Sequence, residues 1–227
     1  GGDEGMVQDT GRRMGRLFAM LGAFVDLVYG TASFEGSVFA DMATFGTYWP
    51  GSSRDDLLNS RFIIMWGWDP ASTIHDTNTT WYLEQAREAG IRIVSIDPRY
   101  TPSAAALADQ WIPIRPGTDT AMMVAMAHTI ITEGLQDQAF LDKYTVGFPK
   151  FRDYVLGSAD GIAKTPEWAE SITGVAADTI RQLAKEYATS KPACLIAGIG
   201  PGRSAHGEQY HRAAITLSAM TGNIGIP

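Results

Sequence analysis

Cysteine is almost absent from this chain of 227 residues, which contains Cys194 alone. A disulfide within the chain is therefore excluded, and so is a zinc or iron–sulfur site built from several of its own cysteines. Positive charge is also scarce, because 18 Lys and Arg against 25 Asp and Glu give 18 − 25 = −7. A general nucleic-acid-binding protein normally carries a basic stripe, so we expect no nucleic-acid partner.

Long apolar runs are missing as well. The longest near the start covers residues 17–25, whereas a membrane-spanning helix needs about 20 apolar residues. Arg12 and Arg13 precede this run and faintly resemble a twin-arginine export signal. No small-residue cleavage site follows, however, and the apolar residues recur at helical spacing. We therefore predict an amphipathic helix over residues 6–26.

Hydrophobic residues make up 45% of the chain and charged residues 19%. This composition supports a packed core and excludes intrinsic disorder as the main state. The chain begins at Gly1 and ends on an apolar, Gly-rich run. We expect it to be a piece of a longer protein.

Short apolar runs alternate with helix-like stretches from residue 61 onward. The runs, typical of strands buried on both faces, cover residues 61–66, 91–96, 110–114 and 193–197. The predicted helices between and after them cover residues 78–88, 103–107, 118–133 and 207–220. The alternation predicts an α/β fold, a three-layer parallel sheet with crossover helices. Residues 137–188 contain no strand-like run and predict an all-helical insert.

Four loops follow predicted strands, at residues 66–70, 97–99, 115–119 and 198–203. Ligands of open parallel sheets collect at the carboxyl ends of the strands. Amides at helix starts bind phosphate, Asp97 could hold ribose hydroxyls, and Asp119 could accept from the N1–H and amino group of a guanine. Together the loops predict a nucleotide-bearing ligand across the sheet edge.

Each signal alone also has an ordinary structural explanation. Asp97 can close a turn, and the helix dipole favours a carboxylate such as Asp119 in a first helical turn. The loop at 198–202 lacks the third glycine of the dinucleotide pattern GxGxxG. Among other candidates, Cys194 is predicted to be an inert buried thiol, and from the residues alone Ser33 is a turn serine.

The order of these motifs resembles the catalytic subunit of the dimethyl sulfoxide reductase family, molybdenum enzymes that carry bis(molybdopterin guanine dinucleotide). The resemblance runs over nearly the whole chain. It is densest in the segments NSRFIIMWGWDP (59–70), IDPRYT (96–101), WIPIRPGTD (111–119), FLDK (140–143), KTPEWA (164–169), GIGPGRSAHGE (198–208) and LSAMTGNIGIP (217–227). It implies one cofactor-binding domain over residues 1–227, a fragment of a larger subunit, with the helical insert at about 137–188.

The resemblance also implies which residues form the site. Those that it assigns to the cofactor are Trp66, Gly67, Trp68 and Asp69 along the cofactor, Asp97 and Pro98 at the guanosine sugar, Gly117 and Asp119 at the guanine, and Gly198, Gly200 and Arg203 at the pterin or phosphate. Ser33, in the segment at 29–33, would be the catalytic residue and an alkoxide ligand to molybdenum. A hard oxygen ligand suits high-valent molybdenum and oxygen-atom transfer.

The implied function is reduction of an S-oxide, an N-oxide or a related oxyanion. The implied partners are that small-molecule substrate, an iron–sulfur electron-transfer subunit and, in some members, a membrane anchor subunit. An iron–sulfur cluster is expected in an N-terminal part outside this chain. The expected location is the extracytoplasmic face of a bacterial membrane, and the fragment alone is expected to be inactive.

Two other functions stay open. One is a structural subunit that keeps the fold without molybdenum, against which Ser33 and the intact nucleotide loops argue. The other is a generic nucleotide-dependent dehydrogenase domain, against which the missing GxGxxG argues.

Overall fold

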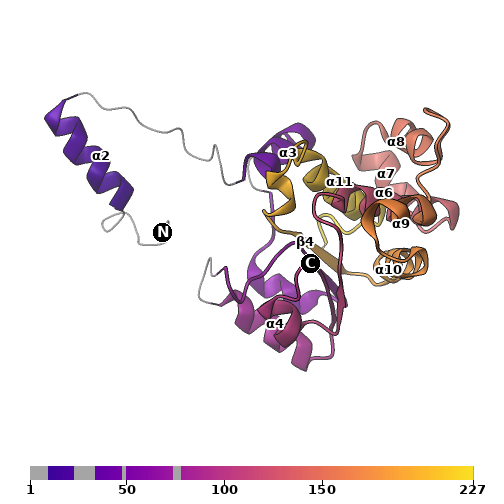
Figure 1. Ribbon diagram of the computed structural model, residues 1–227, viewed down its shortest axis with the longest axis horizontal. Coiled ribbons are helices and arrows are strands. Elements are labelled where there is room, and N and C mark those ends of the chain that lie inside the picture. Colours follow the sequence, from indigo (N-terminus) through magenta and orange to yellow (C-terminus); the bar gives the residue numbers. More distant parts are fainter. Residues whose placement is uncertain (1–9, 23–33, 48–49, 74–77, 227) are drawn as a thin grey trace.

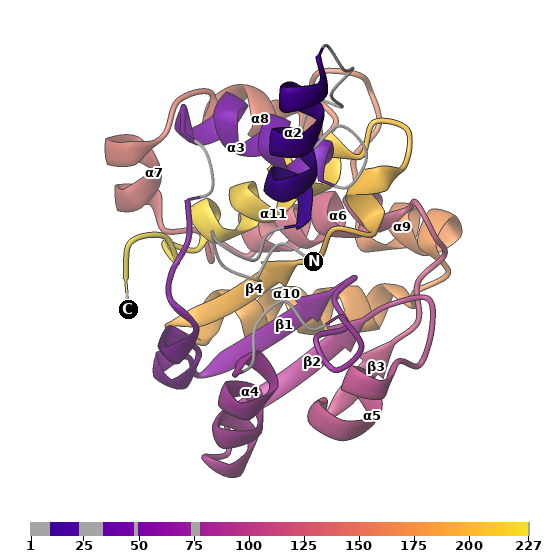
Figure 2. The same cartoon turned by 90° about the vertical axis from the view of Figure 1, so that its left-hand side faces the viewer.

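A four-stranded sheet forms the centre of the computed structural model, which describes residues 10–22, 34–47, 50–73 and 78–226. The strands are β1 (Phe62–Trp66), β2 (Arg92–Ile96), β3 (Gln110–Ile112) and β4 (Ala193–Ala197), in the order β3-β2-β1-β4. All pairings are parallel, as the arrows in Figure 2 show. The predicted parallel sheet is confirmed. The third strand is shorter than predicted, because Pro113 has no N–H to extend the ladder.

Helices cover both faces of the sheet and make three layers (Figure 1). On one face lie α4 (Thr79–Glu88), α5 (Pro102–Leu107) and the 3-10 helix η1 (Arg54–Asn59), and on the other lie α6 (Asp119–Thr132), α10 (Ala177–Thr189) and α11 (Glu208–Met220). Side chains of β1 alternate between the two layers. Ile63 and Met65 pack in the core beneath α4, α5 and η1, whereas Phe62, Ile64 and Trp66 pack in the core beneath α6, α10 and α11. The predicted α/β architecture is therefore confirmed.

The predicted helical insert contains α7 (Gln138–Tyr144), α8 (Phe148–Val155), α9 (Pro166–Thr173) and α10. Side-chain caps fix where two of these helices begin. The Asp137 carboxylate accepts from the Phe140 amide at 3.0 Å, and the Thr165 hydroxyl accepts from the Trp168 amide at 3.2 Å. Pro166 at the first position of α9 needs no N–H partner. The helical insert is part of the main core, because α9 and α10 pack against α6.

Two further helices precede the sheet. The first, α2 (Thr10–Leu21), lies within the predicted helix at 6–26, of which residues 6–9 and 23–26 are outside the described part. The second, α3 (Glu35–Phe45), packs against α11 and the short 3-10 helix η2 (Pro201–Arg203). None of the described helices is long and apolar enough to cross a membrane.

Candidate cofactor site at the carboxyl edge of the sheet

The loops after β1 and β4 meet backbone to backbone. The Gly198 amide donates to the Trp66 carbonyl at 2.7 Å, and a Cβ on Gly198 would collide with the Gly67 carbonyl. Gly67 has a left-handed φ of 56°, and a Cβ there would lie 2.6 Å from Cγ of Pro201. Only glycine fits both positions, so the glycines predicted at this edge hold the two loops in contact.

The loop after β4 rests on a buried histidine. His211 of α11 is 5% exposed, and a Cβ on Gly202 would collide with its Nε2. This Nε2 has no hydrogen-bond partner among the described residues, and burial lowers the pKa of His211 to about 4. The start of α3 reaches the same loop, since a Cβ on Gly36 would lie 2.6 Å from the Gly202 carbonyl. The neutral imidazole of His211 therefore packs against the loop at 198–203, which we call the glycine loop.

Asp119 stands in the first turn of α6 and is only 5% exposed. Its Oδ1 accepts from Nε1 of the fully buried Trp66 at 2.9 Å. Burial raises the pKa of the Asp119 carboxyl, the Trp66 bond opposes this shift, and the nearby Asp97 charge adds to it. The Trp66 hydrogen bond therefore fixes the position of the Asp119 carboxylate. Sequence reasoning missed this link, because the two residues are far apart along the chain.

The two remaining carboxylates at this edge organise their own loops. Asp69 accepts from the hydroxyl of Ser103 at 2.6 Å and from its amide at 3.2 Å, which ties the loop after β1 to α5. Burial alone would raise the pKa of Asp69, but these bonds, together with Ser72 and the Arg99 charge, lower it. Asp97 accepts from the Arg99 amide at 2.8 Å and so closes the turn in which Pro98 lies exposed.

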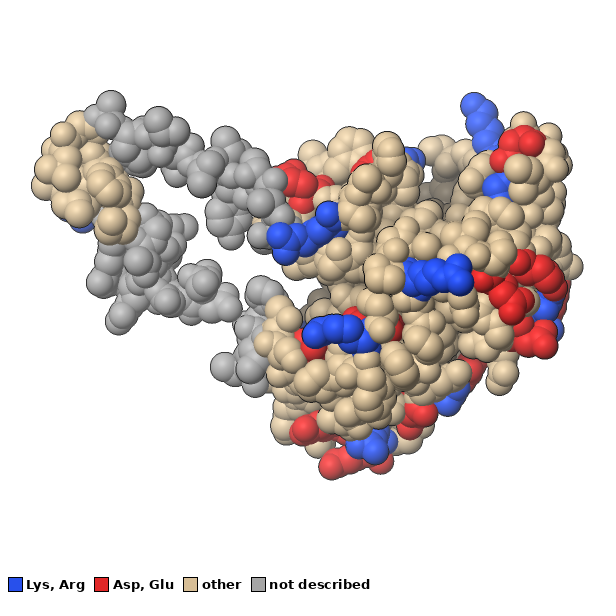
Figure 3. Space-filling model, in the orientation of Figure 1, with Lys and Arg blue, Asp and Glu red and all other residues tan. Residues whose placement is uncertain are grey.

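A pocket of about 260 Å³ opens between α6 and the loop after β4. Gly117, Asp119 and Thr120 line one side, and His206, Gly207 and Tyr210 are among the residues on the other. Gly117 has a left-handed φ of 78°, and nothing lies near the place of its missing Cβ, so a ligand can approach its backbone. In Figure 3, Lys and Arg side chains border the hollow between the part that carries α3 and the part that carries α4.

The structure brings only part of the predicted site into this pocket. Gly117 and Asp119 line this pocket, and the exposed Gly200 and Arg203 belong to its glycine loop. Trp68 instead borders a larger cavity beside β4. Ser33 lies outside the described residues. Within the described ranges, no group of three or more His, Cys, Asp or Glu could hold a metal ion.

These residues fit a cofactor that carries a nucleotide. The pocket offers one buried carboxylate as acceptor, a glycine backbone free of side chains and the glycine loop at the carboxyl end of β4, the edge strand beside β1. Ligands of open α/β sheets bind at the carboxyl ends of the strands, and this set of residues lies there.

The chain belongs to the molybdopterin oxidoreductase family, whose model matches residues 12–227. It is 47% identical to the dimethyl sulfoxide reductase DmsA of Escherichia coli over 81% of this chain and 24% of that protein. It is 39% identical to a trimethylamine-N-oxide reductase of Haemophilus influenzae over 82% of this chain and 23% of that protein. Acetylene hydratase from Pelobacter acetylenicus has a similar structure, with a TM-score of 0.70 and 27% identity over 84% of this chain and 25% of that chain. The chain thus spans about a quarter of the length of these relatives.

Proposed function

We propose that this chain is the part of a molybdenum oxidoreductase subunit that binds the guanine dinucleotide form of molybdopterin. The observation that carries the proposal is the pocket in which Asp119 faces the glycine loop after β4. The Asp119 carboxylate accepts from the N1–H and amino group of the guanine, and the Gly117 backbone permits close approach. The amides of Ile199, Gly200 and Gly202, with the exposed Arg203 side chain, contact the anionic part of the cofactor.

The whole subunit, in this proposal, reduces an S-oxide or N-oxide. Relatives named dimethyl sulfoxide reductase and trimethylamine-N-oxide reductase support this substrate class. When bound, the cofactor supplies two-electron oxygen-atom transfer, while this chain binds and orients it. Electrons would arrive through an iron–sulfur cluster and a partner subunit, on the extracytoplasmic face of a bacterial membrane.

Ser33 would provide the oxygen ligand to the metal. The support is the segment at 29–33 and the position of Gly36, which follows Ser33 by three residues and contacts Gly202 of the glycine loop. In the full-length enzyme, Ser33→Ala and Ser33→Cys should change the electron paramagnetic resonance spectrum of the Mo(V) state. Identical spectra and rates in wild type and both variants would exclude Ser33 as a ligand.

The test of the cofactor assignment is Asp119→Asn in the full-length enzyme. Asparagine keeps an acceptor for Trp66 but loses the negative charge, so guanine binding should weaken roughly ten- to hundredfold, the equivalent of one charge-assisted hydrogen bond. The readout is GMP released on acid hydrolysis together with molybdenum content. Asp109→Asn is the matched control. The Asp109 carboxylate accepts a hydrogen bond from the Ile93 amide at 2.8 Å, near the start of β2 and so at the end of the sheet opposite the pocket. Unchanged GMP in Asp119→Asn would refute the assignment.

A further inference from the structure

The outer edge of β4 carries unpaired backbone groups. β4 pairs with β1 alone within the described residues. The Gly198 amide bonds to the Trp66 carbonyl of β1, whereas the Ala193 amide bonds to the side chain of Asn223. Since backbone groups of a strand alternate in direction, Leu195 and Ala197 present their amides and carbonyls to the open edge. No hydrogen bond to these groups is found in the described part of the chain.

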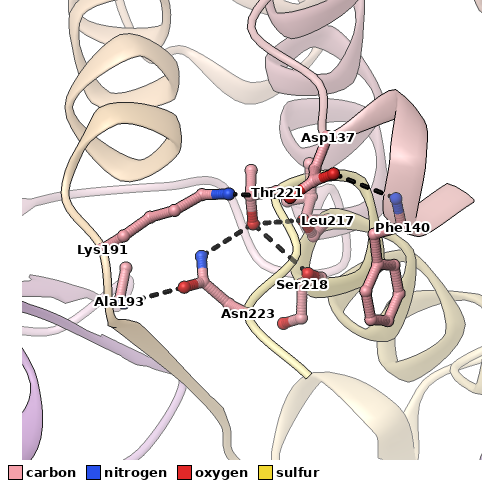
Figure 4. Close-up of polar contacts among 8 residues, drawn as sticks. All are labelled: Asp137, Phe140, Lys191, Ala193, Leu217, Ser218, Thr221 and Asn223. Carbon is pink, nitrogen blue, oxygen red and sulfur yellow. Dashed lines mark hydrogen bonds and ion pairs between the residues drawn. The ribbon is translucent and has the colours of Figure 1, made fainter. Parts of the chain in front are cut away.

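Asn223 caps the first outward amide of β4. Its Oδ1 lies 3.0 Å from the Ala193 amide, where the carbonyl of a neighbouring strand would stand (Figure 4). Its Nδ2 donates to the Thr221 hydroxyl at 2.8 Å, and that hydroxyl donates to the Leu217 carbonyl at 3.0 Å. The amide side chain is therefore fixed in place, and it satisfies the first outward group of β4 and leaves the later ones open.

The apolar side chains of β4 are more exposed than those of β1. All five residues of β1 are buried, whereas Cys194 to Ala197 in β4 are only half-buried although all are apolar. A cavity of about 1050 Å³ runs beside the strand, and its walls include Phe45 of α3 and Ile226, which are 38% and 40% exposed. The walls also include polar residues, among them Asp41, Asp55 and Asp56, so the cavity is mixed in character. An apolar strand with an open edge is a template for strand addition.

We infer that the open edge of β4 and the cavity beside it receive an extended, alternately apolar segment of the same subunit, which adds a strand to the sheet. The relatives support this occupant, because this chain matches only about a quarter of their length and the rest of such a subunit must pack somewhere. The segment bonds to Leu195 and Ala197 and covers the cavity walls. This inference goes beyond the proposed function and does not depend on the cofactor.

Amide hydrogen exchange of the full-length subunit, resolved to single residues by mass spectrometry, tests the inference. The backbone amides of Cys194 and Ile196 point toward β1, so they serve as internal references on the same strand. If a segment covers the edge, Leu195 and Ala197 should exchange within about tenfold of these references. Exchange at Leu195 and Ala197 faster than this would overturn the inference. Protection that disappears on dilution would also overturn it, because a second copy would then be the occupant.

A pair of variants places the segment in the cavity. Phe45→Asp puts a charge into the cavity wall and should speed exchange at Leu195 and Ala197 at least about tenfold, without changing Cys194 and Ile196. Val146→Asp is the control, since Val146 is 100% exposed outside the cavity. No difference between the two variants would contradict the assignment. Loss of GMP binding in Asp119→Asn would affect neither result, so the two proposals can fail separately.

Discussion

The hydrogen bond from Trp66 to Asp119 should make a pH-dependent contribution to stability. Trp66→Phe removes the donor 2.9 Å from Oδ1 and leaves a carboxylate that is only 5% exposed with one partner fewer. A hydrogen bond to a charged group contributes about 1.5–3 kcal/mol, and the smaller Phe side chain adds a packing cost that does not depend on pH.

The direction of the pH dependence follows from the raised pKa of Asp119. The folded state holds this proton more tightly than the unfolded state, so stability falls as the pH rises from the ordinary value of 3.8 through the folded pKa. Trp66 opposes the shift. Its loss raises the folded pKa further, and the cost of Trp66→Phe should therefore be larger at pH 7 than at pH 4.

Urea unfolding of the 227-residue chain, followed by circular dichroism at both pH values, measures this cost. Asp119→Asn is the matched background, because it keeps the acceptor and removes the charge. In that background the cost of Trp66→Phe should be smaller, by about 1 kcal/mol, and independent of pH. A cost that is the same at both pH values, or the same in both backgrounds, would refute the reasoning.

Three further predictions concern the same edge and the core behind it. Gly198→Ala should destabilise the chain by about 1–3 kcal/mol because its Cβ collides with Gly67, whereas Gly200→Ala, whose Cβ would lie 3.8 Å from the Gly67 carbonyl, should change thermal stability little; equal effects would contradict the close approach. His211 has its pKa lowered to about 4, so stability should fall by up to about 3 kcal/mol as the pH drops from 6.5 to 4, and His211→Phe should abolish that fall in unfolding titrations. Cys194 borders the cavity beside β4, but burial raises its pKa to about 12, so a thiol reagent should label the folded chain much more slowly than the unfolded chain at the same pH; equal rates would contradict the raised pKa.

The sequence allowed the sheet and its helices to be predicted because their signals are local. Apolar runs such as Phe62–Trp66 are short and sharply bounded, and caps such as Thr165 mark where helices begin. The prediction for 110–114 overran because apolar character continues through Ile114 while Pro113 ends the ladder. The 3-10 helix at Arg54–Asn59 was not predicted, since six residues carry no usable period.

The candidate site was predictable in its loops and less so in its contacts. The glycines at 67 and 198 were correctly expected at one edge, because parallel strands end together. The hydrogen bond from Trp66 to Asp119 and the packing of His211 against the glycine loop depend on residues brought together only by the fold. The role of Asp97 at a ribose stays a prediction, and its Oδ1 already closes a turn.

The contact between Gly67 and Gly198 has a consequence for the order in which the chain can assemble. The neighbouring strands that these glycines follow, β1 and β4, are separated in sequence by β2, β3 and the whole helical insert. Loop-closure entropy opposes such a distant pairing until the intervening helices have packed. During synthesis the first three strands emerge long before β4, so the contact between Gly67 and Gly198 can form only after they have been made. The carboxyl edge of the sheet is therefore completed late in folding, and a chain captured earlier would have three of the four strands and would lack the contact between Gly67 and Gly198.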